Sequence, residues 1–215
     1  MPLRILIADD HAVVRDGVRA VLEQQPDMTV VAEAADGREC VRLAEEHAPD
    51  VVIMDIAMPN MNGMEATRRV VAANPRAGIV ILSMHQDESY VLGAMKAGAR
   101  AYILKDSVRS DVIDAVRAAA RGQSFLSRKI SRMLQDDYVH DLRSRGLEDR
   151  YDLLTDRERE VLQLVAEGRA NKEVAASLNI GVTTVETHRG HILQKLGLHS
   201  VPELILYAVR KGIIS

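Results

Sequence analysis

The stretch VVIMDIAMPNMNG, residues 51–63, decides the fold class of this chain. Its apolar run, residues 51–54, is typical of a short strand that is buried on both faces, and it ends abruptly in Asp55. Pro59 and Gly63 indicate a loop directly after it. Ligands of open parallel sheets bind where the strands end. We therefore interpret Asp55 as a functional carboxylate, a candidate nucleophile, rather than as a packing residue.

Three further apolar runs, residues 3–8, 78–82 and 100–104, also end in polar side chains. These side chains are Asp9, Asp10, Ser83 and Lys105. Helix-like segments separate the runs, and residues 1–122 contain five strand–helix repeats. Such repeats predict a doubly wound, five-stranded parallel α/β sheet of flavodoxin-like type, with the polar residues gathered at one edge.

A length of 215 residues suits one or two domains, and a composition of 47% apolar and 27% charged residues is ordinary for a soluble globular protein. No apolar run has the length of a transmembrane helix, and the start MPLRILIADD lacks a signal-peptide pattern. A single cysteine, Cys40, excludes an internal disulfide and a cysteine-rich zinc site. These features predict a cytoplasmic protein that does not enter the membrane.

Five sites taken together resemble the receiver domain of two-component response regulators. In chain order they are Asp9-Asp10, Asp55, Ser83, Tyr102 and Lys105. The resemblance implies that residues 1–122 form this domain and that Asp55 accepts a phosphoryl group from a sensor histidine kinase. It also implies a Mg²⁺ ion held by Asp10, Asp55 and the backbone carbonyl of Ala57, with Asp9 acting through water. Oxygen ligands of this kind suit Mg²⁺, which would offset the repulsion between the carboxylates.

By the same resemblance, Lys105 pairs with a phosphoryl oxygen and Ser83 donates a hydrogen bond to another. Tyr102 then moves inward behind Ser83 and changes the outer surface. Each residue has a structural alternative: Asp10 as a helix N-cap, Lys105 as a surface lysine, Ser83 as a turn residue and Tyr102 as a static half-buried side chain. The occurrence of all five sites in one chain favours the functional interpretation.

Residues 123–152 differ in character from the repeats before them. Ile130, Leu134 and Val139 have helical spacing, which predicts a linker helix. The polar, charged stretch RGLEDRYD, residues 145–152, is typical of a flexible tether.

Residues 153–215 form a second, all-helical unit in this interpretation. Thr155–Glu158 and Thr183–Glu186 are both capping-box patterns, and Asn171 is a further N-cap candidate. A short helix, a turn with glycine and a capped helix at 183–196 make a helix-turn-helix pattern. The segment LTDREREVLQLVAEGRANKEVAASLNIGVTTVETHRGHILQKLG resembles the LuxR-type DNA-binding domain, and the resemblance covers about residues 153–215. Together with a receiver, this is the arrangement of NarL/FixJ-type response regulators.

The helix at 183–196 would be the recognition helix. Val185, His188, Ile192 and Leu196 share one helical face and are expected in the core. The other faces supply the candidates for DNA contact, which are Thr184, Glu186, Thr187, Arg189, Gly190 and Lys195, joined by Lys172 from the preceding helix. Acidic and basic residues are equal in number over 151–215, so the DNA-binding prediction depends on motif rather than on charge.

The sequence thus predicts a phosphorylation-dependent transcription regulator that binds double-stranded DNA and dimerises when phosphorylated. As an enzyme it would perform only its own phosphoryl transfer to Asp55 and slow autodephosphorylation. Three alternatives stay open. An aspartyl phosphohydrolase is disfavoured because Ala57 stands where such enzymes carry a second aspartate. The others are a regulator with a vestigial acidic cleft, and an interaction module that does not bind DNA, suggested by Glu186 and Gly190.

Overall fold

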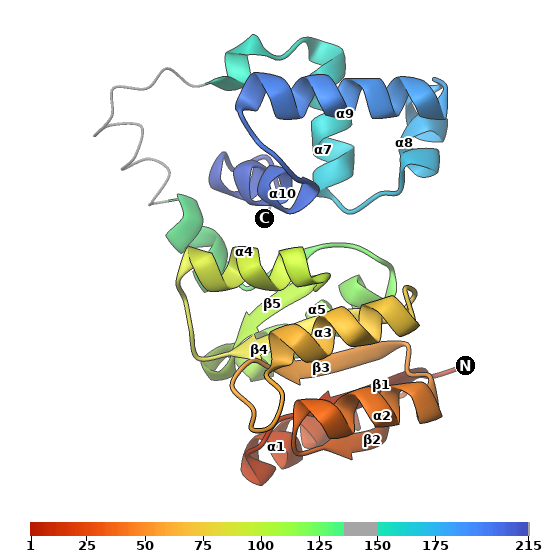
Figure 1. Ribbon diagram of the computed structural model, residues 1–215, viewed down its shortest axis with the longest axis vertical. Helices are drawn as coiled ribbons and strands as arrows, with labels where there is room; N and C mark the ends of the chain where they lie inside the picture. Colours follow the sequence, from red (N-terminus) through yellow and green to blue (C-terminus); the bar gives the residue numbers. More distant parts are fainter. Residues whose placement is uncertain (136–149, 215) are drawn as a thin grey trace. The chain divides into compact units, whose positions relative to one another are not determined.

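The structure, a computed structural model, describes residues 1–135 and 150–214 and divides into two compact units (Figure 1). The first comprises Met1–Ser127 and the second Arg128–Ser215. Each unit has its own hydrophobic core. None of the helices in the described ranges is long and apolar enough to cross a membrane.

The first unit is built on a single parallel sheet with the strand order β2-β1-β3-β4-β5-β6. Its strands are β1 (Leu3–Ala8), β2 (Met28–Ala34), β3 (Val51–Asp55), β4 (Gly78–Ser83), β5 (Ala101–Leu104) and β6 (Phe125–Leu126). The chain starts near the centre, moves to one edge and then crosses to the other side, so the order reverses between β1 and β3. This topological switch point is where open α/β sheets place their sites.

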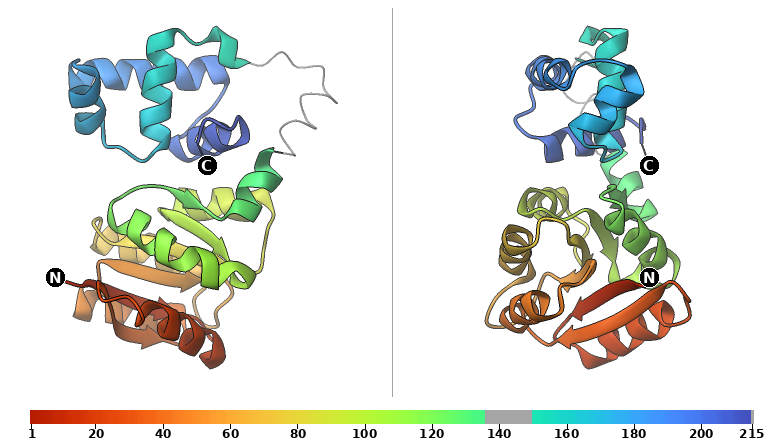
Figure 2. Two further views of the ribbon diagram at one scale, coloured as in Figure 1. Left: turned by 180° about the vertical axis from the view of Figure 1, so that it is seen from behind. Right: turned by 90° about the vertical axis from the view of Figure 1, so that its right-hand side faces the viewer.

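Five helices cover the two faces of the sheet. They are α1 (Ala12–Leu22), α2 (Gly37–His47), α3 (Gly63–Ala73), α4 (Glu88–Ala97) and α5 (Val108–Ala120). Helices α1 and α5 lie on one face, and α2, α3 and α4 on the other (Figure 2). The predicted doubly wound α/β fold is therefore confirmed.

The sheet differs from the prediction in its sixth strand, because five strands were expected and residues 125 and 126 were assigned to the linker. Phe125 and Leu126 pair in parallel with Ala101 and Tyr102 at the outer edge of β5. A two-residue strand is too short to show a periodic pattern, so its existence depends on the neighbouring strand that it meets.

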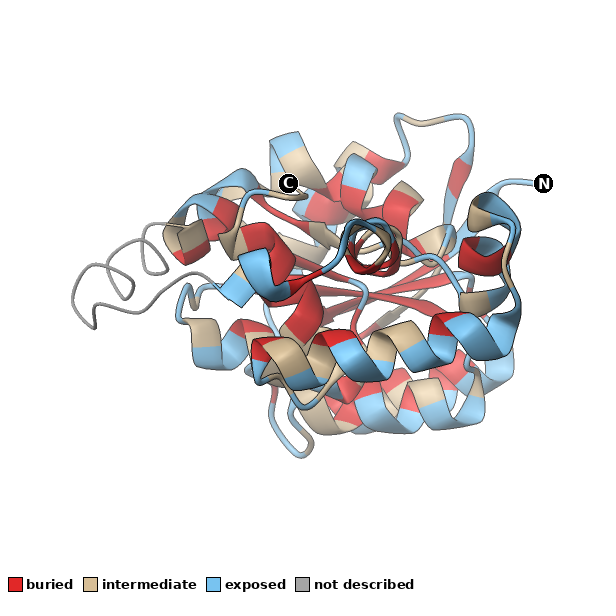
Figure 3. Ribbon diagram, turned by 90° about the horizontal axis from the view of Figure 1, so that it is seen from above, coloured by how far each residue is buried: buried red, intermediate tan, exposed pale blue. Residues whose placement is uncertain are grey.

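The central strands form the core of this unit. Every residue of β3, β4 and β5 is buried, as expected for strands covered on both sides (Figure 3). Gly63 begins α3 immediately beside β3. A Cβ atom at this position would lie 1.9 Å from the backbone oxygen of Asp55, so only glycine lets α3 pack this close to the end of the strand.

The second unit is helical. Residues 128–135 form a helix, followed after the undescribed residues by a 3₁₀ turn, η2 (Arg150–Leu153). The remaining helices are α7 (Asp156–Ala166), α8 (Asn171–Leu178), α9 (Val182–Leu196) and α10 (Val201–Arg210). Ile130 and Leu134 are both buried, in agreement with the predicted linker helix, whereas Val139 lies outside the described residues.

One of the three predicted helix caps is confirmed and two are wrong. Thr155 and Glu158 form a reciprocal capping box at the start of α7. Helix α8 begins one residue earlier than predicted: Ala170 is its N-cap, and the Glu173 carboxylate accepts the Ala170 N–H at 2.8 Å. Helix α9 begins after Gly181 with no side-chain cap, so Thr183 is already inside the helix and makes no capping box.

Candidate functional site

The first candidate site lies where β1, β3 and β5 end. Asp9 follows β1, Asp55 ends β3, and Lys105 follows β5. The Lys105 ammonium lies between the two carboxylates, with Nζ 2.7 Å from Oδ2 of Asp9 and 2.9 Å from Oδ2 of Asp55. The sheet therefore brings together residues that are far apart in the chain, as the strand-end argument predicted.

The electrostatics of this cleft are set by burial. Asp9 is completely buried and Asp55 nearly so. Burial raises the pKa of Asp55 above its ordinary value; the charge of Asp9 acts in the same direction and the Lys105 ammonium opposes it. Burial alone would lower the pKa of Lys105, but its hydrogen bonds to the two carboxylates raise it overall. One cation thus offsets part of the repulsion between two crowded carboxylates.

Asp10 and His11 extend the cluster towards solvent. The His11 ring Nδ1 lies 2.7 Å from Oδ1 of Asp10 and 3.3 Å from Oδ1 of Asp9. His11, and not Asp10, is the N-cap residue of α1, which removes the capping explanation for Asp10. Donor atoms of Asp9, Asp10, His11 and Asp55 all lie within 4.8 Å of one another, so this group could hold a metal ion.

A second group of residues adjoins the cleft at the end of β4. Ser83 is buried; its hydroxyl oxygen accepts the His85 N–H at 3.0 Å, and its side chain also hydrogen-bonds with Tyr102. Tyr102 on β5 is fully buried, and its hydroxyl donates to the His85 carbonyl at 2.9 Å. Burial raises the pKa of Tyr102 to about 12. The imidazole of His85 stacks on the Tyr90 ring of α4 with centroids 4.0 Å apart.

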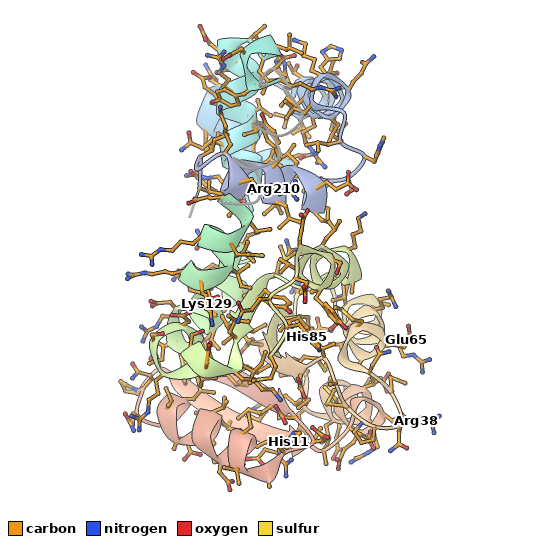
Figure 4. The ribbon with its side chains drawn as sticks, turned by 90° about the vertical axis from the view of Figure 1, so that its left-hand side faces the viewer. His11, Arg38, Glu65, His85, Lys129 and Arg210 are labelled. Atoms are coloured by element: carbon orange, nitrogen blue, oxygen red, sulfur yellow. The ribbon has the colours of Figure 1, made fainter. Side chains whose placement is uncertain are left out.

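This group links the cleft to the surface. Tyr90 was not among the predicted site residues, and only the packing of the β4–α4 loop against α4 reveals it. Ala57, two residues after Asp55, is exposed, and its N–H bonds to the Asp55 carboxylate. Figure 4 labels His11 and His85 among the side chains of this unit.

The second candidate site is the exposed side of α9. Val185, Ile192 and Leu196 are buried in the core of the unit, as the helical spacing predicted, whereas His188 is only half-buried. The exposed residues of α9 include four of the predicted contact residues, Thr184, Glu186, Thr187 and Gly190. Apart from its own helix backbone and chain neighbours, no atom lies within 4 Å of a Cβ built on Gly190, so a side chain there would have space.

The three predicted basic contacts have different surroundings. Lys172 is exposed at the start of α8. Arg189 donates from Nη1 to Oδ1 of Asn171 at 2.7 Å, which ties α9 to α8. Lys195 pairs with the buried Glu158 carboxylate at 2.7 Å, which ties α9 to α7. Two of the three cations are therefore already engaged within the unit.

Comparison with known proteins gives the same division of the chain. The response regulator receiver domain family matches residues 5–117, and the luxR family of bacterial regulatory proteins matches residues 152–208. The oxygen regulatory protein NreC of Staphylococcus carnosus is 42% identical over 215 residues, covering 99% of each chain.

Solved structures show the same likeness. A LuxR-family two-component response regulator from an Aurantimonas species is 38% identical with a TM-score of 0.61, covering 65% of this chain and 99% of that one. A structure of two RcsB dimers bound to two parallel DNAs is 25% identical with a TM-score of 0.58, covering 98% and 99% of the two chains.

Proposed function

Because the chain belongs to the LuxR-type response regulators, transcription regulators of two-component systems, we propose that phosphorylation of Asp55 controls its binding to promoter DNA. The observation that carries this proposal is the position of Lys105 between Asp9 and Asp55. A cation held at a buried aspartate at the end of a central strand suits a carboxylate that must accept further negative charge.

In the proposed reaction an Asp55 carboxylate oxygen attacks the phosphorus of a phosphohistidine on a sensor kinase. An O–P bond forms, the N–P bond breaks, and the histidine leaves as imidazole. Lys105 then exchanges its bond to the Asp55 carboxylate for one to a phosphoryl oxygen. The Ser83 hydroxyl, whose oxygen already accepts from His85, donates its proton to another phosphoryl oxygen.

The acidic cluster fits Mg²⁺, because carboxylate and carbonyl oxygens are the donors that this ion prefers. When bound, Mg²⁺ would neutralise the charge that accumulates on the phosphoryl oxygens. Asp10, Asp55 and the Ala57 carbonyl would hold it, with Asp9 acting through water.

The signal would pass from the cleft through Ser83. A shift of Ser83 towards the phosphoryl group moves its partner His85, whose carbonyl accepts from Tyr102 and whose ring stacks on Tyr90. Tyr102 is already inward in this conformation, so its hydroxyl would follow the His85 carbonyl. Phosphorylation would thus be a local change of charge in the cleft that shifts the group of Ser83, His85 and Tyr102 between two arrangements.

The output would be made by α9 in the major groove of DNA. Thr184 near the helix N-terminus suits a phosphate, Glu186 can accept from cytosine N4, and the Thr187 methyl can contact thymine. The RcsB dimers on DNA support a dimer of this chain on paired half-sites. Residues 123–152 would act as the linker between a receiver at 1–122 and a DNA-binding domain at 153–215.

Intact-protein mass spectrometry after incubation with acetyl phosphate and Mg²⁺ tests the acceptor. We expect one phosphoryl group on the wild type and on Asp16→Asn, an exposed aspartate of α1 that serves as a matched control. We expect none on Asp55→Asn or in the presence of EDTA. A phosphoryl group on Asp55→Asn would show that another residue is the acceptor. No gain in any sample would favour a regulator with a vestigial cleft.

DNA binding is then measured on the phosphorylated and unphosphorylated wild type over a range of salt concentrations. Binding strengthened by phosphorylation and weakened by salt is expected. Equal DNA binding by the phosphorylated and unphosphorylated forms would refute the proposal that phosphorylation of Asp55 controls DNA binding.

A further inference from the structure

His11 is the one nitrogen donor among the four residues whose donor atoms gather in the acidic cleft. We propose that His11 is a metal ligand that sets the selectivity of the cleft, so that it takes divalent transition-metal ions such as Co²⁺ or Zn²⁺ in preference to Mg²⁺. This inference rests on the metal site of the proposed function and concerns which ion occupies it.

The geometry around His11 already resembles that of a ligand. An octahedral ion with bonds of about 2.1 Å separates adjacent donors by about 3.0 Å and opposite donors by about 4.2 Å. Nδ1 of His11 lies 2.7 Å from Oδ1 of Asp10 and 3.3 Å from Oδ1 of Asp9. The four donor atoms span no more than 4.8 Å, so a small contraction would bring those of Asp10, His11 and Asp55 around one ion, with Asp9 acting through water.

The surroundings hold these donors in place and keep the ring accessible. The backbone N–H of His11 donates to Oδ1 of Asp9 at 2.8 Å. The same Asp9 oxygen lies 3.3 Å from Nδ1 of the His11 ring. Lys105 is bonded to the other oxygen of Asp9, so it does not block this side of the carboxylate. The His11 side chain is 67% exposed, and an ion can therefore reach it from solvent.

The chemistry of the donors makes the contribution of His11 selective. Mg²⁺ demands oxygen ligands and keeps several waters, so a water would fill the position next to His11. Imidazole binds Co²⁺, Ni²⁺ and Zn²⁺ well and replaces that water. His11 should therefore strengthen the binding of transition metals and leave the binding of Mg²⁺ almost unchanged. A transition-metal ion would then compete with Mg²⁺ for the phosphorylation cleft.

Isothermal titration of the full chain with Co²⁺ and with Mg²⁺ measures this difference. Every protein carries His191→Gln, because His188 and His191 are spaced i, i+3 on α9 and could together chelate Co²⁺. The variant is His11→Asn, which keeps hydrogen-bonding capacity and an N-cap residue at the start of α1. His47→Asn, at the last turn of α2, is the matched control. Paramagnetic broadening of the amide signals by Co²⁺ locates the bound ion.

We expect His11→Asn to weaken Co²⁺ binding by about 10-fold or more and to change the Mg²⁺ dissociation constant by less than about 2-fold. Broadening should centre on residues 9–11 and 55–57 and move away from them in the variant. Equal changes for both ions, or none, would overturn the selectivity role of His11.

Asp10→Asn separates this inference from the proposed function. It should weaken both ions, because it removes a shared ligand. If Mg²⁺ failed to bind the His191→Gln protein, the metal site of the proposed function would itself be refuted, and the selectivity role of His11 with it. If Mg²⁺ bound normally and Co²⁺ did not depend on His11, only the present inference would fail.

Discussion

The pairing of Lys195 with Glu158 can be tested by Lys195→Met, which keeps most of the apolar stem and removes the ammonium. Glu158 is only 3% exposed, and its carboxylate also accepts from the N–H and hydroxyl of Thr155. Burial alone would raise the pKa of Glu158, but the Lys195 ammonium and the Thr155 donors outweigh it and lower the pKa to about 2. Loss of Lys195 leaves a buried carboxylate without its cation.

The pKa gives the size of the effect. A change from 4.5 to about 2 corresponds to roughly 3 kcal/mol, at about 1.4 kcal/mol for each pKa unit. Thr155 supplies part of this, and the Lys195 side chain is 35% exposed, so solvent screens the pair. We therefore expect Lys195→Met to lower the free energy of unfolding of the second unit by about 1–2 kcal/mol at pH 7.

The pH dependence has a definite sign. Because the folded-state pKa of Glu158 lies below its ordinary value, the stabilisation is present above about pH 4.5 and is lost as the pH falls towards 2. The penalty of Lys195→Met should shrink over the same range. Urea unfolding at several pH values measures it, and a double-mutant cycle with Glu158→Gln isolates the pair. A coupling energy below about 0.3 kcal/mol at pH 7 would refute the reasoning.

The same variant decides between two roles for Lys195. If Glu158 holds the ammonium, Lys195→Met should leave the salt dependence of DNA binding unchanged. Lys172→Met, at an exposed lysine, is the comparison. Loss of a phosphate contact there should reduce the steepness of the plot of log binding constant against log salt concentration by about 1. A reduced slope for Lys195→Met would show that Lys195 contacts phosphate.

Four further outcomes follow from the structure. Asp55→Asn should stabilise the first unit at pH 7 and stabilise it less at acid pH. Because the pKa of Asp55 is raised in the folded state, ionising this carboxyl lowers the free energy of unfolding as the pH rises from its unfolded-state pKa towards its folded-state pKa. Urea unfolding at a series of pH values measures the effect. Gly63→Ala should cost more than about 3 kcal/mol or prevent folding, since the added Cβ meets backbone; circular dichroism would show it. Tyr102→Phe should cost about 1 kcal/mol by removing the hydroxyl from the His85 carbonyl, as thermal unfolding would report. Gly190→Ala should stabilise α9 by about 0.5–1 kcal/mol, and an unchanged or lower melting temperature would contradict this.

The fold of the first unit could be predicted because its signals are local and strong. Strands buried on both faces are apolar throughout, and each is followed by a helix with its own periodicity. Polar residues at the strand ends then indicate a site, because parallel strands all end at one edge. Strand β6 escaped this reasoning because two residues carry no period, and only pairing with β5 makes Phe125 and Leu126 a strand.

The helix caps of the second unit show where local patterns mislead. Thr155–Glu158 matched its motif and formed the capping box. Thr183–Glu186 matches the same motif, yet α9 begins before it, after Gly181. Asn171 was available as a cap, but its side chain is used by Arg189. A cap depends on where packing places the first turn, which the four residues of a motif do not specify.

Local sequence patterns were enough to predict the two domains, the parallel sheet and the aspartate, serine and lysine positions at the ends of its strands, because neighbouring residues carry the periodicity and the apolar runs. Tyr102 lies within β5 and was identified by resemblance to the receiver family. The side-chain partners came from the tertiary structure alone: His11 pairs with Asp10, the Tyr102 hydroxyl with the His85 carbonyl, and Lys195 with Glu158. The last pair joins residues 37 positions apart. Such contacts depend on distances of a few ångströms between separate elements, and no local pattern in the chain encodes them.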